Sequence, residues 1–222
     1  MLVSLIQGHG STGDIRADPF YLAPEAHQGK SERDRTMTQG TTHGPHGPHG
    51  PQAPSPWILQ WADDVPAGAP VLDLACGGGR HGRYFLAHGH PVTFLDRDVS
   101  ALADLSAGDG TAAEILEADL ETGCPFPLRE RRFGAVVVVN YLWRPIMGDI
   151  ARAVAPGGLL LYETFMAGNE AFGRPRNPDH LLQPGELRET FAGSLEILAF
   201  EEGRIDKPAP AMKQWLAARR PA

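Results

Sequence analysis

The segment VLDLACGGGRHG, residues 71–82, is the feature that most constrains the fold of this chain. Its apolar first half is typical of a buried strand, and three consecutive glycines separate that half from a helical stretch at 79–88. Glycines at such a turn let a ligand approach the backbone, and the start of the following helix presents unpaired N–H groups. The segment therefore predicts a strand, a ligand-binding loop and a helix, with an anionic or carboxylate-bearing ligand.

Further apolar runs bounded by turn residues follow this segment and alternate with helical stretches. The run GAVVVVN, residues 134–140, is continuous and is typical of a strand buried on both faces. This alternation indicates an α/β fold with a parallel sheet and helices on both faces. The expected strands are 71–75, 92–96, 114–119, 134–140, 159–165, 194–200 and 212–219, the expected helices are 57–65, 79–88, 99–105 and 146–154, and a polar loop is expected at 173–187.

Three acidic residues accompany the first three strands and bear on the ligand. Asp73 lies within the first strand, Asp96 ends the second and Asp119 follows the third. The loop also fits the dinucleotide fingerprint G-x-G-x-x-G, with Asp96 19 residues after its first glycine, so a nicotinamide cofactor is one alternative. A carboxylate beside a phosphate is unfavourable, whereas three carboxylates suit an adenosine with a cationic, zwitterionic tail. The acids therefore favour a sulfonium cofactor.

With these motifs the chain resembles the class I S-adenosylmethionine-dependent methyltransferases over about residues 57–219. VLDLACGGGRHG is similar to their first motif, VTFLDRD to their second and EADL to their third. The resemblance implies a Rossmann-like three-layer α/β sandwich: a mostly parallel seven-stranded sheet of order 3-2-1-4-5-7-6 with an antiparallel C-terminal strand. It also implies S-adenosyl-L-methionine as cofactor.

The same resemblance implies which residues hold that cofactor. The methionine end would lie against the glycine loop, where Ala75 replaces the family's usual first glycine. The ribose would bind at the end of the second strand, the adenine at the end of the third, and the methyl donor beside the segment after the fourth. The implied cofactor-binding residues are Asp73, Ala75, Cys76, Gly77, Gly79, Asp96, Arg97, Asp119, Leu120 and Asn140.

Side chains after the fourth and fifth strands are the candidates for contact with a methyl acceptor, because open α/β sheets bind ligands at the carboxyl ends of their strands. We expect Tyr141, Arg144 and Glu163 to face the acceptor, and the loop 166–187 to cover it. The stretch ETFMAGNEAFGRPRNPDHLLQPGEL, residues 163–187, resembles the bacterial branch related to tellurite-resistance and thiopurine-type methyltransferases, which implies a small molecule or oxyanion as acceptor. Methyl transfer from a sulfonium is expected to be an in-line displacement. In the covering loop, Arg174 and Arg176 either bind an anionic acceptor or lie in a solvated loop and pair with Asp179. His180 in the same loop is a candidate base.

Composition excludes several other classes of protein. A net charge of -7 speaks against binding to nucleic acid, and the absence of a long apolar run speaks against a membrane span. Two cysteines, Cys76 and Cys124, suit a reducing cytoplasm and exclude a disulfide scaffold. No metal site is expected, the oligomeric state stays open, and a non-catalytic S-adenosylmethionine-binding module is an alternative to an enzyme.

Glycine and proline are concentrated in the first quarter of the chain. Residues 1–55 are predicted to be a disordered low-complexity tail, and residues 56–222 the methyltransferase domain. The tail contains the repeat HGPHGPHGP at 43–51, either a weak metal-binding tract or a linker. Because no periodic pattern precedes Met37, we hypothesise that this residue is the native start.

Overall fold

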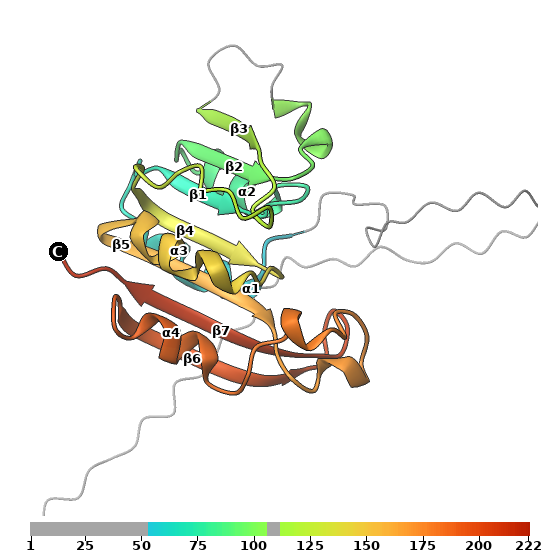
Figure 1. Ribbon diagram of the computed structural model, residues 1–222. Coiled ribbons are helices and arrows are strands. Elements are labelled where there is room, and N and C mark those ends of the chain that lie inside the picture. The colour runs from blue at the N-terminus through green and yellow to red at the C-terminus, as the bar shows by residue number, and fades with distance from the viewer. Residues whose placement is uncertain (1–52, 106–111) are drawn as a thin grey trace, which may run out of the picture. The chain divides into compact units, whose positions relative to one another are not determined.

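The computed structural model describes residues 53–105 and 112–222, which contain a seven-stranded sheet flanked by short helices (Figure 1). The strand order β3-β2-β1-β4-β5-β7-β6 confirms the predicted order. The strands are β1 (Val71–Leu74), β2 (Val92–Asp96), β3 (Ala113–Glu117), β4 (Phe133–Val139), β5 (Val154–Phe165), β6 (Glu196–Ile205) and β7 (Ala211–Arg219).

Strand direction decides which residues meet at the carboxyl edge of the sheet. Strands β1 to β5 are parallel, with β1 between β2 and β4. Strand β7 runs antiparallel to both β5 and β6, so its first residues lie beside the last residues of β5. The ends of β1, β2, β4 and β5 and the start of β7 therefore share one edge, where ligands of open α/β sheets bind.

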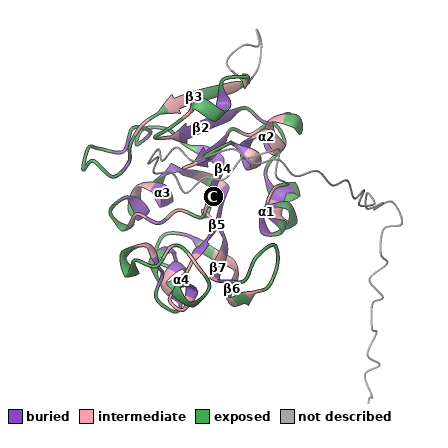
Figure 2. Ribbon diagram, turned by 90° about the vertical axis from the view of Figure 1, so that its right-hand side faces the viewer, coloured by how far each residue is buried: buried purple, intermediate pink, exposed green. Residues whose placement is uncertain are grey.

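Two layers of helix cover the sheet, as Figure 2 shows edge-on. Helices α1 (Pro56–Trp61) and α2 (Arg80–Ala87) cover one face, where Trp57 and Phe85 pack against Val137 and other strand residues. Helices α3 (Met147–Ala153) and α4 (Glu186–Phe191) cover the other face, where Tyr162 and Phe191 are buried. The remaining helical pieces are single 3-10 turns: η1 (Ala62–Asp64), η2 (Ser100–Leu102), η4 (Arg144–Ile146), η5 (Asn169–Ala171) and η6 (Pro178–His180).

The predicted elements and the observed ones differ in several places, one of which is strand β6 (Glu196–Ile205): it ends at Ile205 rather than at residue 200. The helix expected at 99–105 is only the short turn η2, in which Leu102 alone is buried. Strand β5 begins at Val154 rather than at residue 159, with a register irregularity opposite Phe133 and Ala135. The expected polar loop 173–187 contains the start of α4, whose Leu187 and Phe191 lie four residues apart and are both buried. This i, i+4 pair is a helical signal that the many polar neighbours obscure.

The boundaries of the folded part can be compared with the predicted tail. Ser55, the last residue of that tail, is buried and caps α1, because its Oγ accepts a hydrogen bond from the Trp57 backbone N–H. The histidine repeat and Met37 lie outside the described residues. Within residues 53–105 and 112–222, no helix has the length and apolar composition needed to cross a bilayer.

Candidate cofactor and acceptor site

Asp73 ties the first strand to the helix that follows the glycine loop. Its side chain is buried, and its Oδ2 accepts a hydrogen bond of 2.7 Å from the Gly82 backbone N–H in α2. Burial raises the pKa of Asp73 to about 7, and the hydrogen bond from Gly82 opposes that rise. A carboxyl group with this pKa changes charge near neutral pH.

The glycine loop is shaped by left-handed backbone and by close packing against β2. Ala75, Gly77 and Gly79 have φ values of 52°, 54° and 71°. A Cβ on Gly79 would lie 2.9 Å from the Phe94 ring, so no larger residue fits there. A Cβ on Gly77 would instead meet nothing within 4 Å. The loop is thus packed underneath and open outward, as a cradle for a ligand requires.

Asp96 fixes the open side of this loop. Its Oδ2 accepts a hydrogen bond of 2.7 Å from the Gly77 backbone N–H, and its Oδ1 accepts one of 3.1 Å from the Asp98 N–H. Arg83 holds the next loop residue by donating from Nε to the carbonyl oxygen of Gly78 at 3.1 Å. Arg97, beside Asp96, is exposed. Asp96 itself is half-exposed next to the loop. The resemblance to methyltransferases implies that the ribose of the cofactor binds at this place.

Cys76 lies in the middle of the loop and is buried. Its backbone N–H donates to the carbonyl oxygen of Leu95 at 3.1 Å, which extends the pairing of β1 and β2 by one residue. Burial raises the pKa of the thiol, and the charges of Asp73 and Asp96 raise it further. The thiol stays protonated at neutral pH and is not an activated nucleophile.

The two residues implied for adenine binding have different surroundings. Asp119 is exposed after β3, and its Oδ1 accepts a hydrogen bond of 2.9 Å from the Glu121 N–H within a turn. Leu120 is buried in the hydrophobic core on the side of α3 and α4. Their adenine contacts remain predictions.

A network of polar side chains, of which Ser55, Glu163 and Lys213 are buried, joins the ends of β4 and β5 to the start of β7. The Lys213 Nζ donates to Glu163 Oε1 at 2.9 Å and to Asn140 Oδ1 at 2.7 Å. The Ser55 Oγ donates to Glu163 Oε2, which connects the segment before α1 to the same group. Both carboxylate oxygens of Glu163 are thus occupied, so we assign Glu163 a role in holding Lys213 rather than in contacting an acceptor.

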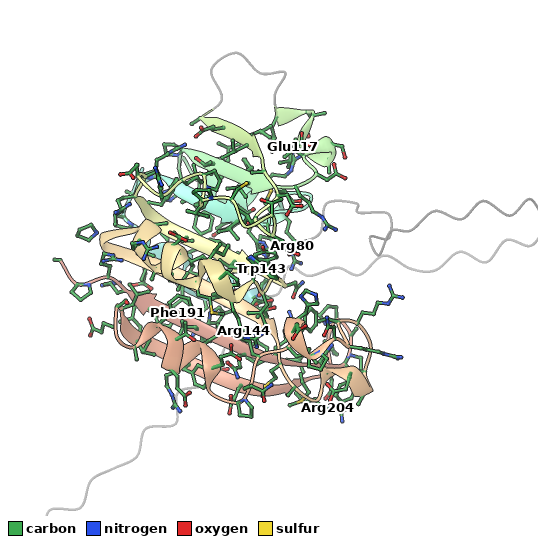
Figure 3. The ribbon with its side chains drawn as sticks, viewed as in Figure 1. Arg80, Glu117, Trp143, Arg144, Phe191 and Arg204 are labelled. Atoms are coloured by element: carbon green, nitrogen blue, oxygen red, sulfur yellow. The ribbon has the colours of Figure 1, made fainter. Side chains whose placement is uncertain are left out.

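Arg144, a predicted acceptor-facing residue, instead holds the loop after β5. Its Nε and Nη2 donate to the two carboxylate oxygens of Glu186 at 2.6 and 2.9 Å. It also donates to the carbonyl oxygens of Asp179 and Leu181 at 2.7 and 2.9 Å, and Figure 3 marks its position. With four hydrogen bonds to that segment, Arg144 holds residues 179–186 against the start of η4.

Tyr141 and His81 are two further titratable groups at this edge, and both are neutral. The Tyr141 hydroxyl oxygen is buried and has no hydrogen-bond partner among the described residues. Burial raises the pKa of this phenol, and nearby carboxylates including Asp96 add to the rise. Burial lowers the pKa of His81 to about 3, helped by the charges of Arg80 and Lys213. Neither side chain is therefore suited to remove a proton near pH 7.

The candidates of the covering loop lie apart from the buried network. Arg174 and Arg176 are exposed, and the Arg176 Nε donates to the carbonyl oxygen of Gly173 at 3.3 Å. Within the described part of the chain, neither arginine forms the ion pair with Asp179 that was one alternative. His180 is half-buried in η6.

Three further residues of this edge, Ser55, His81 and Lys213, are not among the predicted site residues. His81 belongs to the loop motif itself, and Lys213 interrupts an apolar strand, which is the signal that could have found it. A lysine in a buried strand needs a partner, because burying an unpaired charge is costly. The partner, Glu163, lies 50 residues earlier in the sequence.

Comparisons with known proteins agree with this geometry. Residues 71–158 match a family model described as a methyltransferase domain. No curated protein matches the sequence. Among solved structures, TehB from Haemophilus influenzae is similar with a TM-score of 0.59 and 19% identity, over 73% of this chain and 61% of that chain. This chain thus spans less than two thirds of TehB.

Two other solved structures show how broadly this fold is used. The 1,6-didemethyltoxoflavin-N1-methyltransferase of Burkholderia thailandensis, crystallised with its substrate and S-adenosylhomocysteine, is similar with a TM-score of 0.56 and 21% identity, over 75% of this chain and 77% of that chain. SpnF, described as a [4+2]-cyclase, is similar with a TM-score of 0.57 and 17% identity, over 75% of this chain and 80% of that chain. At these identities the likeness concerns the fold.

The matched segment and the fold agree with each other. Residues 71–158 match a methyltransferase domain, and the strand order is that of the Rossmann-like methyltransferase fold, whose usual cofactor is S-adenosylmethionine. The residues present fit that cofactor: an outward-open glycine loop, a half-exposed carboxylate at the end of β2, and a buried carboxyl group beneath the loop.

Proposed function

We propose that this protein transfers the methyl group of S-adenosylmethionine to a small-molecule or oxyanion acceptor by in-line displacement. The observation that carries the proposal is the loop 75–79, open above Gly77 and held by Asp96 at the edge where Asn140 follows β4. The cofactor supplies an electrophilic methyl group on a sulfonium. The protein has to hold it, orient the acceptor and exclude water.

The chain's own residues would divide this work between two halves of the edge. Asp73, Asp96 and the loop would bind the cofactor on the side of β1 and β2. On the other side, Asn140 and Tyr141 follow β4, and Arg144 anchors the loop that we expect to cover the acceptor. Tyr141 and Cys76 are held neutral, and Glu163 is engaged by two partners. An acceptor that attacks without a protein base fits this arrangement.

Support for a small acceptor comes from the size of the site's surroundings. The segments between β5 and β6 and between β6 and β7 consist of short turns and one six-residue helix, α4. The similar methyltransferase from Burkholderia thailandensis is one named for 1,6-didemethyltoxoflavin and crystallised with that compound bound. We expect no nucleic-acid partner, since the net charge is -7. Both cysteines are free thiols, which suits our expectation of a cytoplasmic enzyme.

Two alternatives are separable by experiment. A nicotinamide oxidoreductase would use the same glycine loop, but a buried carboxyl group at Asp73 beneath it disfavours a pyrophosphate. A non-catalytic module would bind the cofactor and methylate nothing.

Calorimetry with S-adenosylhomocysteine and with NAD tests the cofactor, and binding of NAD alone would refute the proposal. A screen of phenols, carboxylic acids, small thiols, selenite and tellurite, measured as S-adenosylhomocysteine formation, tests the reaction. Cofactor binding without turnover of any small acceptor would favour the module.

A further inference from the structure

The network around Lys213 supports a more specific inference about the acceptor. We propose that Lys213 is a positioning residue that orients the Asn140 amide, so that its NH2 group donates a hydrogen bond to an oxygen of the acceptor. The inference rests on the proposed methyl transfer and names the class of acceptor: a molecule that presents a hydrogen-bond-accepting oxygen at the reacting position.

The orientation of the Asn140 amide follows from the chemistry of its partner. An ammonium group can only donate hydrogen bonds, so the Asn140 atom 2.7 Å from Lys213 Nζ must be the carbonyl oxygen. The NH2 group then points away from Lys213. Among the described residues, no hydrogen-bond acceptor contacts it, although Lys213 itself is buried. The free donor is therefore on the outward side of an exposed residue.

The backbone of Asn140 is held as firmly as its side chain. Its φ of 58° lies in the left-handed region, where asparagine is tolerated better than most residues. Its N–H donates to the carbonyl oxygen of Glu163 at 2.9 Å, which extends the pairing of β4 and β5. Because Leu74 pairs with Val138, Asn140 is level with the start of the glycine loop. The donor is thus fixed beside the place where the cofactor would bind.

Packing alone does not explain a charged residue at position 213. The Lys213 side chain is 9% exposed and that of Glu163 is 4% exposed. A buried ion pair usually stabilises a fold no better than apolar side chains of the same volume. Here the carboxylate receives a second hydrogen bond from Ser55, and the ammonium lies 4.9 Å from the centre of the Phe165 ring. These contacts hold the ammonium group in place and direct it at Asn140.

This donor selects among nucleophiles. Lys213 and Glu163 form an ion pair of no net charge, so the hydrogen bond from Asn140, rather than a net positive charge, would discriminate between acceptors. An oxygen with two lone pairs can accept that bond with one and attack the methyl carbon with the other. The oxygen–carbon bond forms as the carbon–sulfur bond breaks, the electron pair stays on sulfur, and a phenol or acid releases its proton to solvent. An amine uses its only lone pair to attack the methyl carbon. Its remaining N–H groups are donors and cannot accept a hydrogen bond from the Asn140 NH2 group.

The decisive variant is Lys213→Met, with Gln214→Met as its matched control. Gln214 is the next residue of β7 and is fully buried, but its hydrogen bonds are with Leu187, Gln183 and Glu202. Both substitutions remove a buried polar group, so both should cost stability, and only Lys213→Met should affect Asn140. The NMR signals of the Asn140 NH2 group, assigned by their loss in Asn140→Asp, should move in Lys213→Met and stay in Gln214→Met.

Kinetics with phenol, benzoate and selenite test the acceptor class, with 2-mercaptoethanol and benzylamine as comparisons. We expect Lys213→Met to lower kcat/KM for the oxygen acceptors at least about tenfold, with partial recovery in Lys213→Arg and less than about threefold change in Gln214→Met. Affinity for S-adenosylhomocysteine should stay within about threefold in all three variants.

Each arm has an outcome that overturns the proposal. An unmoved Asn140 signal in Lys213→Met removes the positioning role, and a large loss of S-adenosylhomocysteine affinity assigns Lys213 to the cofactor instead. Methylation of only the thiol or the amine, or of none of the three oxygen acceptors, refutes the acceptor class. Failure of the wild-type protein to bind S-adenosylhomocysteine refutes the proposed function itself, and the NMR comparison still decides whether Lys213 orients the amide.

Discussion

Replacing Asp73 with Asn should stabilise the protein at neutral and alkaline pH while weakening cofactor binding. Asp73 is buried, and burial raises its pKa from 3.8 to about 7. Between these values the folded protein keeps a proton that the unfolded chain has released. The folded state then binds more protons than the unfolded state, so this residue lowers the free energy of unfolding as pH rises from about 4 to 7.

The expected magnitude follows from the same shift. A difference of about 3 pH units corresponds to about 4 kcal/mol at pH values above both pKa values. Between pH 5 and pH 8 the change amounts to about 2.5 kcal/mol. Asparagine at position 73 has no charge to bury, and its Oδ1 can accept the same hydrogen bond from the Gly82 N–H. The difference in stability between Asp73→Asn and the wild type should therefore grow by about 2.5 kcal/mol over that range.

Urea unfolding of both proteins at pH 5, 6, 7 and 8 measures this difference. Groups that titrate equally in both proteins cancel in the subtraction. Calorimetry with S-adenosylmethionine is the functional counterpart: wild-type affinity should rise with pH through about 7 as Asp73 gains its charge, and Asp73→Asn should bind at least about tenfold more weakly without that rise. A stability difference that does not vary with pH would refute a buried carboxyl group with a raised pKa.

Three further substitutions test the loop and its cover. Asp96→Ala should weaken S-adenosylhomocysteine binding by about 1–3 kcal/mol in calorimetry, and unchanged affinity would remove this carboxylate from the site. Ala75→Gly should raise the free energy of urea unfolding by up to about 1 kcal/mol, because it relieves a left-handed alanine with φ 52°; a decrease would contradict that strain. Arg144→Met should raise hydrogen-exchange rates in 178–187 about tenfold by removing the pair with Glu186. Equal exchange in variant and wild type would show that other contacts hold the cover.

The fold was predictable because its signals are local. The run 135–139 is apolar throughout and forms most of strand β4, and a glycine loop follows β1 directly in sequence. Helix α4 was missed because its two apolar residues, Leu187 and Phe191, stand among charged neighbours in six residues. The short turn η2 replaced an expected helix next to residues 106–111, which the structure does not describe. Periodicity over so few residues does not distinguish a helix from a turn.

The two halves of the candidate site differ in how far sequence can specify them. The geometry of the cofactor side depends on backbone conformation. A short continuous stretch of sequence, residues 73–79, therefore specifies most of it. On the acceptor side the geometry depends on side chains from separate elements: Ser55 meets Glu163 across 108 positions, and Lys213 meets Asn140 across 73. Those contacts require the register of antiparallel β7 against β5, and a shift of one residue would turn Lys213 to the opposite face. An alternating pattern gives the faces of a strand but not its register, so the network could be found only in the folded structure.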